Sequence, residues 1–483
     1  MPITGKQIKH AETDTSPPAP GAALMAGWAP TLQTEGSTKY AAVVAAIERG
    51  VADGVLLPGM RLPPQRDIAT YLNVTIATVT KAISIAMRRG LVTARAGSGT
   101  FIAARPAEGV AQDGLPAILD LSLNAPPVDI TAALLQENLK DVANVMNAAN
   151  GFDYQPIPGS VQHREAGRDW FAKRGYQVDA ERILITQGAH EGLVVSLLAL
   201  TQPGDTVLCE RLNYTGLRRI GDLLRIKLIG IDVDSEGIDV DALPALIERH
   251  QAKAIVCTPA MHNPTSVTMS ARRRAALVST ARAAGVPIVE DDIYGLFLGS
   301  EAPPLATLWP DGVVAVTSLS KTVAPGLRLG YIAAPTSLVP RLRDAMLMLA
   351  WTEPVLQAAV ATRLITSGRA DQCVALHRTE AQRRVALAKS ILGAAMQTPD
   401  RTATYHVWVS TGDIRSDEMA AELYREGVQV SPASHFLIGE APVPHAMRLS
   451  LGRASTIQVL GEALKRVAER LSLGRSRGLD SIV

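Results

Sequence analysis

The chain has 483 residues, of which 47% are hydrophobic and 19% charged, with a formal net charge of +2. Domains usually hold about 100–200 residues, so this length predicts two or three of them. The apolar content excludes global disorder, and the near-neutral balance excludes a chain that is basic throughout. Cys209, Cys257 and Cys373 are far apart and lack metal-ligand spacing. We therefore expect no metal site and a reducing, cytoplasmic location.

The termini and the apolar runs give no sign of a membrane partner. The N-terminal sequence has no apolar stretch suited to a signal peptide. No run approaches the ~18 uninterrupted apolar residues of a membrane span. Residues 1–37 are rich in Pro, Ala, Thr and Gly without a steady period, and they are expected to form a flexible tail. Residues 474–483 are expected to form a C-terminal tail.

Positive charge is concentrated in one segment of domain size. Residues 38–105 hold nine basic and three acidic side chains, a local net charge of +6. The remainder of the chain is slightly acidic. Such a local excess is typical of a domain that binds a polyanion.

The periodicity of this segment predicts three helices. Val43, Val44 and Ile47 have helical spacing, and a Gly- and Pro-rich stretch ends that helix. RDIATYLNV then predicts a short helix that ends near Asn73. TIATVTKAISIAMRRG follows, with Thr75 as its N-cap. Two short helices joined by a tight turn can place the second helix in the major groove of DNA.

The end of the segment alternates like a small hairpin, LVTARAGSGTFIA, with glycines at its tip. Periodicity alone leaves two interpretations open, a small structural cap or a DNA-binding module. The motifs RLPPQRDIA and GSGTF favour the DNA-binding module, because with them the whole segment 38–104 resembles the winged helix of GntR-type regulators. The resemblance implies double-stranded DNA as partner, with contacts from Arg66, Thr75, Thr78, Thr80, Lys81, Arg95, Gly97, Ser98 and Gly99. Ile76 stands where the family often has Arg, which puts one guanine contact in doubt.

Beyond an expected linker at 105–117, the texture changes to short apolar runs that alternate with helical segments. The runs at 183–186, 206–209, 254–257, 287–290 and 313–318 are apolar almost throughout. They indicate a parallel sheet covered by helices on both faces. We place a large α/β domain at 118–340. Residues 341–473 read as helices, one or two strands and a closing helix, which suits a smaller α+β domain.

The most informative motif of the large domain is TSLSKTVAPGLRLGY at 317–331. A lone lysine in a loop is usually a solvated charge. Lys321, however, directly follows an apolar strand, where desolvation lowers the pKa of an amine and prepares it for a Schiff base. The hydroxyls of Ser318 and Ser320 and the guanidinium of Arg328 are suited to binding a phosphate.

Four upstream motifs supply further polar groups at predicted strand ends. IVEDDIYG offers the Asp291 carboxylate for a pyridine nitrogen and the Tyr294 hydroxyl for a phenolic oxygen. The Asn263 amide is suited to the same oxygen, and the Tyr214 ring to stacking. The free N–H groups of Gly188, Ala189 and His190, at a helix start, are suited to a phosphate. Each motif alone is weak and has an ordinary structural explanation, such as a turn or a polar strand end.

Together and in this order, the motifs resemble those of fold-type I aminotransferases over residues 118–472. The resemblance implies pyridoxal 5′-phosphate as cofactor and Lys321 as its Schiff-base residue. It also implies that Tyr154 reaches the cofactor phosphate of a neighbouring subunit and that Arg448 binds a substrate carboxylate. Ser266, His190 and Ile293 depart from the residues common in the family, at the positions of Gly, Gln and Pro.

A GntR-type winged helix followed by a linker and an aminotransferase-like domain resembles the MocR (GabR-like) regulators from end to end. That resemblance implies a homodimer. We further expect that the protein senses a small amino-compound effector by aldimine exchange at Lys321 and that this changes DNA binding. One alternative is a working aminotransferase with an appended DNA-binding head. A second is a domain that has lost its cofactor and serves only as a dimerisation scaffold.

Overall fold

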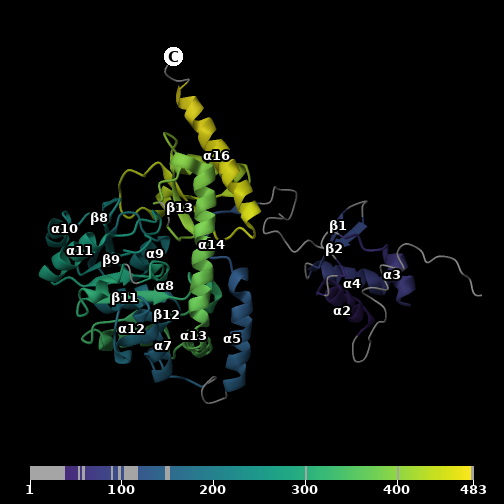
Figure 1. Cartoon of the computed structure of the whole chain (residues 1–483), viewed down its shortest axis with the longest axis horizontal. Helices are drawn as coiled ribbons and strands as arrows, with labels where there is room; N and C mark the ends of the chain where they lie inside the picture. Colours follow the sequence, from purple (N-terminus) through teal and green to yellow (C-terminus); the bar gives the residue numbers. More distant parts are fainter. Residues whose placement is uncertain are drawn as a thin grey trace, which may run out of the picture. The chain divides into compact units, whose positions relative to one another are not determined.

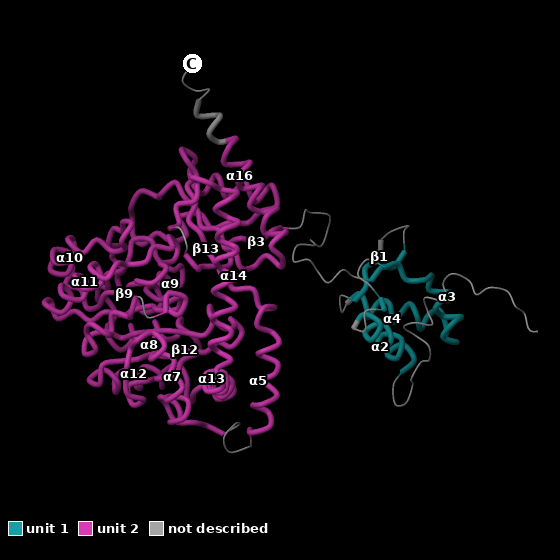
Figure 2. The backbone as a smooth tube through the Cα atoms, in the orientation of Figure 1, with its two compact units in different colours: residues 1–110 teal, residues 111–483 magenta. Residues whose placement is uncertain are grey.

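A computed structural model of the chain describes most of its length, in two compact units, residues 1–110 and 111–483 (Figure 2). The described residues are 38–52, 55–56, 60–88, 91–95, 99–102, 118–146, 153–299, 302–399 and 402–479. Side chains are not described for 52, 88, 94, 95 and 474–479. The expected tail at 1–37 and linker at 105–117 therefore lie outside the described residues.

The first unit contains the predicted three helices and hairpin. Its elements are α2 (Lys39–Ala52), α3 (Gln65–Tyr71), α4 (Ile76–Arg88), β1 (Val92–Arg95) and β2 (Gly99–Ile102). The helices bury one shared apolar core, in which Ile47, Ile68 and Val79 are almost inaccessible to solvent. β1 and β2 pair antiparallel, from Val92 opposite Ile102 to Arg95 opposite Gly99.

Among the described residues, no single helix is both long and apolar enough to cross a membrane. Gln65–Tyr71 and Ile76–Met87 together reach the required length and composition, but they bend by 116° at their junction. Buried apolar side chains of both helices belong to the core of the first unit. Helices that form the core of a soluble domain meet the same criterion.

The second unit is built on a sheet of seven strands (Figure 1). In spatial order they are β4 (Ile183–Thr186), β12 (Gly330–Ala333), β11 (Val313–Ser318), β10 (Ile288–Asp291), β9 (Ala254–Cys257), β5 (Thr206–Glu210) and β6 (Lys227–Ile231). The five predicted strands, β4, β5, β9, β10 and β11, run in one direction, as expected, and the sheet contains two further strands, β6 and β12. β12 runs antiparallel to both β11 and β4, since it returns directly from the turn after β11.

Alternate residues of each strand enter different cores, as the pleat requires. Ile183 and Ile185 of β4 pack in one apolar cluster, whereas Leu184 packs in the other. Both faces are therefore covered by helices, and this explains why the strands are apolar throughout. The helices of this part are α5 (Ala132–Val145), α7 (Val161–Ala172), α8 (Ala189–Leu200), α9 (Thr215–Leu224), α10 (Leu243–His250), α11 (Ala271–Ala283), α12 (Val339–Leu349) and α13 (Val355–Thr366). A short hairpin, β7 (Val233–Asp234) and β8 (Gly237–Ile238), follows β6.

A third apolar cluster lies around the C-terminal strands. Its strands are β13 (His406–Ser410), β16 (Ala446–Ser450), β15 (Ser431–Pro432), β14 (Val428–Gln429) and β3 (Leu119–Asp120). Its helices are α14 (Arg369–Leu392), α15 (Ser416–Arg425) and α16 (Ile457–Leu479). α14 spans two clusters, because Cys373 packs with the large sheet and Val385 with the C-terminal strands.

Two helices that follow the expected boundary at 340/341 still pack against the large sheet. Leu342 in α12 and Leu364 in α13 pack in the clusters of the large sheet. β3, which lies at the start of the second unit, pairs parallel with β14 among the C-terminal strands. The segment 119–125 thus connects the start of this unit with its C-terminal strands, a pairing that local patterns do not reveal.

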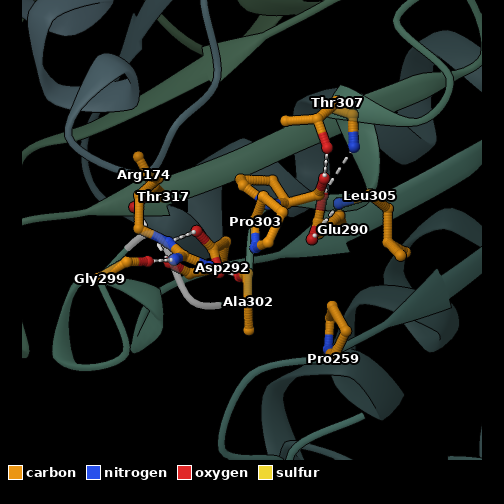
Figure 3. A network of polar contacts seen from close by, with 12 residues as sticks. Arg174, Pro259, Glu290, Asp292, Gly299, Ala302, Pro303, Leu305, Thr307 and Thr317 are labelled. Atoms are coloured by element: carbon orange, nitrogen blue, oxygen red, sulfur yellow. Dashed lines mark hydrogen bonds and ion pairs between the residues drawn. The ribbon is translucent and has the colours of Figure 1, made fainter. Parts of the chain in front are cut away.

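A buried ion pair holds the end of β10 in place. Arg174 Nε and Nη2 donate to the two carboxylate oxygens of Asp292, at 2.8 and 3.1 Å, and both side chains are almost fully buried (Figure 3). Arg174 also donates to the carbonyl oxygens of Gly299 and Ala302. The neighbouring Glu290 accepts from the backbone N–H of Leu305 at 2.9 Å (Figure 3).

Removing one member of this pair leaves the other charge buried without its partner. We expect Arg174→Ala to lower the free energy of unfolding by about 3–5 kcal/mol. Arg168→Ala is the matched control, because its pair with Asp169 is exposed and is worth about 0–1 kcal/mol. Urea denaturation of both variants measures the difference. Equal losses in the two would contradict a structural role for the buried pair.

Candidate active site

A cavity of about 710 Å³ lies in the second unit and brings together most of the predicted cofactor and substrate residues. The predicted residues that line it are Ala189, His190, Tyr214, Asn263, Asp291, Tyr294, Ser318, Ser320, Lys321, Arg328 and Arg448. Several follow the carboxyl ends of β9, β10 and β11, where open α/β sheets bind ligands. The cavity also includes Ser431 and Arg448 from the C-terminal strands.

Lys321 lies three residues beyond β11 and is partly buried. Its Nζ donates to the backbone oxygen of Asn124. Burial lowers the pKa of Lys321 to about 8, and the nearby positive charges of Arg448 and Arg328 contribute to the lowering. The amine is therefore uncharged in a larger fraction of molecules near neutral pH than a solvated lysine would be, and an uncharged amine is the nucleophilic form.

Three successive acids at the end of β10 have different surroundings. Glu290 and Asp292 belong to the polar network described above, whereas Asp291 lines the cavity. Such alternation follows from the strand pleat. Asp291 is 5% exposed, and its Oδ1 has no hydrogen-bond partner among the described residues. Burial, followed by the charge of Asp292, raises the pKa of Asp291 to about 7.

Arg328 lies next to Gly188, the residue before α8. Gly188 has φ of 90°, and a Cβ there would lie 3.1 Å from Arg328 Nη2, so glycine allows the guanidinium to approach. Arg328 donates to the Gln187 oxygen at 3.2 Å. Ser318 Oγ accepts from the N–H of Ser320 at 3.3 Å, while Ser320 Oγ has no partner within the described ranges.

Arg448 in β16 is held on several sides. Its Nη1 donates to Asn263 Oδ1 at 2.9 Å, and its Nη2 donates to the backbone oxygen of Ser122. The guanidinium carbon lies 4.9 Å from the centre of the Phe436 ring. Burial lowers the pKa of Arg448 to about 10, which still leaves it charged at neutral pH. Asn263 therefore contacts the predicted carboxylate-binding arginine directly.

The aromatic residues of the site are arranged around the same cavity. The rings of His190 and Tyr214 meet edge to face, with centroids 6.1 Å apart. Burial lowers the pKa of His190, with smaller contributions from Arg328 and Arg219, so the ring is neutral at pH 7. Tyr294 is fully buried, and its hydroxyl accepts from Asn124 Nδ2 at 2.6 Å.

The donors and acceptors of the cavity fit pyridoxal phosphate. Among the described residues, Asp291 Oδ1, Ser320 Oγ and Arg448 Nε are buried and lack a hydrogen-bond partner. An unpaired buried polar atom costs about 1–3 kcal/mol, and a bound polar group that pairs with it would recover that cost. A carboxylate, an amine, a guanidinium and hydroxyls around one cavity are the groups that a pyridine, an aldehyde and a phosphate require.

Several lining residues were not predicted from the sequence. They are Ser122, Asn124, Arg218, Arg219, Ser431 and His435. Asn124 contacts Tyr294, which is 170 positions away in the chain. Its surroundings, APPVD, gave no motif. Arg218 and Arg219 lie on α9, which begins directly after Tyr214. Their helical spacing from Tyr214 is the pattern from which they could have been predicted.

Tyr154 does not line the cavity of its own chain, and it is 80% exposed. Its backbone N–H donates to Asp153 Oδ1 at 2.8 Å. The next residue, Gln155, exchanges backbone hydrogen bonds with the Thr352 hydroxyl at 2.9 and 3.0 Å. The predicted contact of Tyr154 with a neighbouring subunit stays a prediction.

In the first unit, the predicted threonines lie at the start of α4. Thr75 Oγ1 accepts from the N–H of Thr78 at 3.2 Å, as an N-cap does. Thr80 Oγ1 donates to Gln65 Oε1 at 2.7 Å, so this hydroxyl also joins α4 to α3. Ile76 is 56% exposed. Thr75, Ile76 and Thr80 are therefore accessible to solvent near the start of α4, as the predicted contact with DNA requires.

The predicted basic residues of the first unit are also at its surface. Arg66 in α3 and Lys81 in α4 are exposed, and Lys81 Nζ lies 4.1 Å from the centre of the Tyr40 ring. Gly99 begins β2, with φ of 111°. The side chain of Arg95, as well as Gly97 and Ser98, lies outside the described residues. Which of these residues contact DNA stays a prediction.

Two family models match the chain. The model "Aminotransferase class I and II" matches residues 116–467, and the model "Bacterial regulatory proteins, gntR family" matches residues 39–102. An uncharacterized HTH-type transcriptional regulator, YdeF of Bacillus subtilis, is 27% identical over 440 residues, which are 90% of this chain and 95% of YdeF. The HTH-type transcriptional regulator TauR of Rhodobacter capsulatus is 28% identical over 467 residues, 88% of this chain and 95% of TauR.

Among solved structures, a kynurenine aminotransferase of Pyrococcus horikoshii in complex with PMP superposes with a TM-score of 0.67. The two sequences are 24% identical, and the match covers 74% of this chain and 91% of the aminotransferase. The match shows that the second unit has the aminotransferase fold. The chain belongs to the aminotransferase class I and II family and carries a gntR-family domain before it, the domain order of MocR (GabR-like) regulators.

Proposed function

We propose that this protein is a DNA-binding transcriptional regulator whose second unit holds pyridoxal 5′-phosphate and senses a small amino compound there. One observation carries the proposal. A single chain combines a winged helix with a cavity in which Lys321, Asp291 and Arg448 meet. A metabolic aminotransferase requires the cavity but not the winged helix.

Each part of the cofactor has a candidate partner in the cavity. Arg328, Ser318, Ser320 and the N–H groups at the start of α8 would bind its phosphate. Asp291 would pair with the ring nitrogen, Tyr294 and Asn263 would reach the phenolic oxygen, and Tyr214 would stack on the ring. When bound, pyridoxal phosphate supplies an aldehyde that condenses with an amine, either that of Lys321 or that of the effector.

The charge of the cavity favours an effector that is an anion as well as an amine. Arg218, Arg219, Arg328 and Arg448 line it, together with Lys321, whereas Asp291 is the acid among its lining residues. The cofactor phosphate neutralises part of this charge, and Arg448 remains for a carboxylate, which it can bind through two hydrogen bonds. The proposed effector is therefore an amino compound that bears a carboxylate.

A homodimer is part of the proposal, and an apolar surface supports it. Tyr154, Met348 and Trp351 are between 79% and 82% exposed. The hydrogen bonds between Gln155 and Thr352 place the segments of Tyr154 and Trp351 side by side. Exposed apolar side chains that gather in this way are typical of a protein interface. A dimer also supplies two winged helices to a repeated DNA site.

The lowered pKa of Lys321 predicts how its reaction with pyridoxal phosphate depends on pH. As the pH rises through about 8, the amine loses its proton and becomes nucleophilic, so the rate of cofactor capture by the empty protein should rise and then level off. Stopped-flow absorbance measures that rate.

Hydride trapping and mass spectrometry should place the cofactor on Lys321. Lys321→Ala should lose the adduct, whereas Lys227→Ala, at an exposed position of β6, should keep it; an adduct that persists on another lysine would contradict the assignment.

Asp291→Asn should weaken cofactor retention, because the variant keeps the size of the side chain but cannot ionise to pair with a protonated ring nitrogen. A charge-assisted hydrogen bond of about 2–3 kcal/mol corresponds to a rise in the dissociation constant of about 30- to 150-fold. Equilibrium dialysis with absorbance detection gives this constant. Asp413→Asn, at an exposed position of the C-terminal part, is the control. Equal retention in both variants would exclude Asp291 as the ring partner.

Arg66→Ala and Lys81→Ala should each weaken DNA binding while leaving cofactor absorbance unchanged, because both residues lie in the first unit. If each contacts one phosphate, the slope of log affinity against log salt should fall by about 0.9. Fluorescence anisotropy with the DNA upstream of the protein's own coding sequence measures both quantities. Lys140→Ala, an exposed position on α5, is the control. Absence of DNA binding at any salt concentration, with fast turnover of an amino donor, would instead support the alternative of a working aminotransferase.

A further inference from the structure

The segment 119–125 crosses the cavity between its two most important cations. The backbone oxygen of Ser122 accepts from Arg448, and the backbone oxygen of Asn124 accepts from Lys321. A carboxylate bound by Arg448 would compete with the first carbonyl for the guanidinium N–H groups. An imine at Lys321 would remove the ammonium donor from the second.

The Asn124 side chain joins this segment to two neighbouring residues, Tyr294 and His406, whose ring centroids lie 5.4 Å apart. Its Nδ2 donates to the Tyr294 hydroxyl at 2.6 Å and lies 3.2 Å from His406 Nδ1 in β13. The Nε2 of His406 lies 3.1 Å from the His262 oxygen, which accepts a hydrogen bond from that nitrogen. His406 is neutral, since burial lowers its pKa to about 3. With its proton on Nε2, His406 accepts at Nδ1, and the orientation of the Asn124 amide follows.

The same segment is attached to the C-terminal strands. Leu119 N–H donates to the Gly427 oxygen and Leu121 N–H to the Gln429 oxygen, both at 2.8 Å. Ser450 N–H, two residues after Arg448 in β16, donates to the Leu121 oxygen at 2.7 Å. In the chain, residue 118 directly follows the stretch 103–117 that leads from the winged helix. The segment is therefore the first described part of the second unit after the DNA-binding unit.

We propose that segment 119–125 transmits occupancy of the cavity to the chain that leads to the winged helix. A ligand that takes Lys321 removes the side-chain donor of the Asn124 carbonyl. A ligand that takes Arg448 removes the charged donor of the Ser122 carbonyl, which keeps only the Ser431 and Ser450 hydroxyls at 3.3 Å, and the attachment of the segment to the C-terminal strands weakens. The proposal rests on the proposed function, because it needs a cofactor at Lys321 and a carboxylate at Arg448. The inference adds to that function the segment, 119–125, that responds to both the cofactor and the carboxylate.

Hydrogen–deuterium exchange of the full chain tests the two carbonyls separately with three probes. Pyridoxamine 5′-phosphate has no aldehyde for Lys321 and no carboxylate for Arg448. Pyridoxal 5′-phosphate adds the bond to Lys321, and N-(5′-phosphopyridoxyl)-L-leucine adds the carboxylate instead. Relative to pyridoxamine 5′-phosphate, each of the other two should speed exchange of the Leu119 and Leu121 amides by about 3-fold or more, as for a locally weakened segment.

Absorbance measured on the same samples separates the two possible failures. If no probe binds, the proposed function fails and the inference with it. If the probes bind and exchange at 119–125 is equal in all three complexes, or slower with the two probes that engage the cations, only the inference is overturned.

A variant pair provides a check that needs no probe. Arg448→Met removes the charged donor to the Ser122 carbonyl and leaves it the Ser431 and Ser450 hydroxyls. Exchange at 119–125 should therefore already be faster in this variant, and N-(5′-phosphopyridoxyl)-L-leucine should not raise it further. Arg274→Met is the matched control, because Arg274 is also buried and donates to the carbonyls of Met269, Pro303 and Pro259, away from the lining of the cavity. Equal exchange at 119–125 in the two variants would overturn the proposal. Thermal melts show whether either variant fails to fold, and the three-probe comparison with the unaltered protein remains decisive in that case.

Discussion

The buried ion pair between Arg174 and Asp292 fixes the end of β10, and the direction of Asp291 depends on it. Because neighbouring strand residues point to opposite faces, holding Asp292 in the polar network leaves Asp291 on the side of the cavity. Burial raises the pKa of Asp291 to about 7, so this carboxyl is ready to share a proton with a basic ring nitrogen. The structural carboxylate of Asp292 thus positions the carboxyl group of Asp291, which is available for binding. The two roles belong to consecutive residues of the chain.

Across the cavity, desolvation acts in the opposite sense on the cations. It lowers the pKa of Lys321 to about 8 and that of Arg448 to about 10. The lysine is therefore partly neutral near physiological pH, whereas the arginine remains charged. The same physical effect makes one group a nucleophile and keeps the other an anion-binding site, because their intrinsic pKa values differ by about two units or more. Both are held by carbonyls of one segment, which connects the chemistry of the cavity to the start of the second unit.

Many residues that line the cavity were predicted, because they follow apolar strands and belong to recognisable sequence motifs. Lys321 after β11 and Asp291 at the end of β10 are local features, and parallel strands bring their carboxyl ends to one edge of the sheet. Asn124 was not predicted, since its partners Tyr294, Lys321 and His406 are all more than 160 positions away in the chain. β12 was not among the predicted strands, and its antiparallel pairing with both β4 and β11 is likewise a tertiary feature.

Sequence alone determined the helix periods, the apolar strands, the basic first unit and the order of the polar motifs, since these are set by neighbouring residues. Tertiary structure decided which of three successive acids faces the cavity, that Asn263 contacts Arg448, and that β3 pairs with β14. These features arise from contacts between distant parts of the chain. They depend on how the layers pack, and the packing of distant elements cannot be predicted from the local periodicity of the sequence.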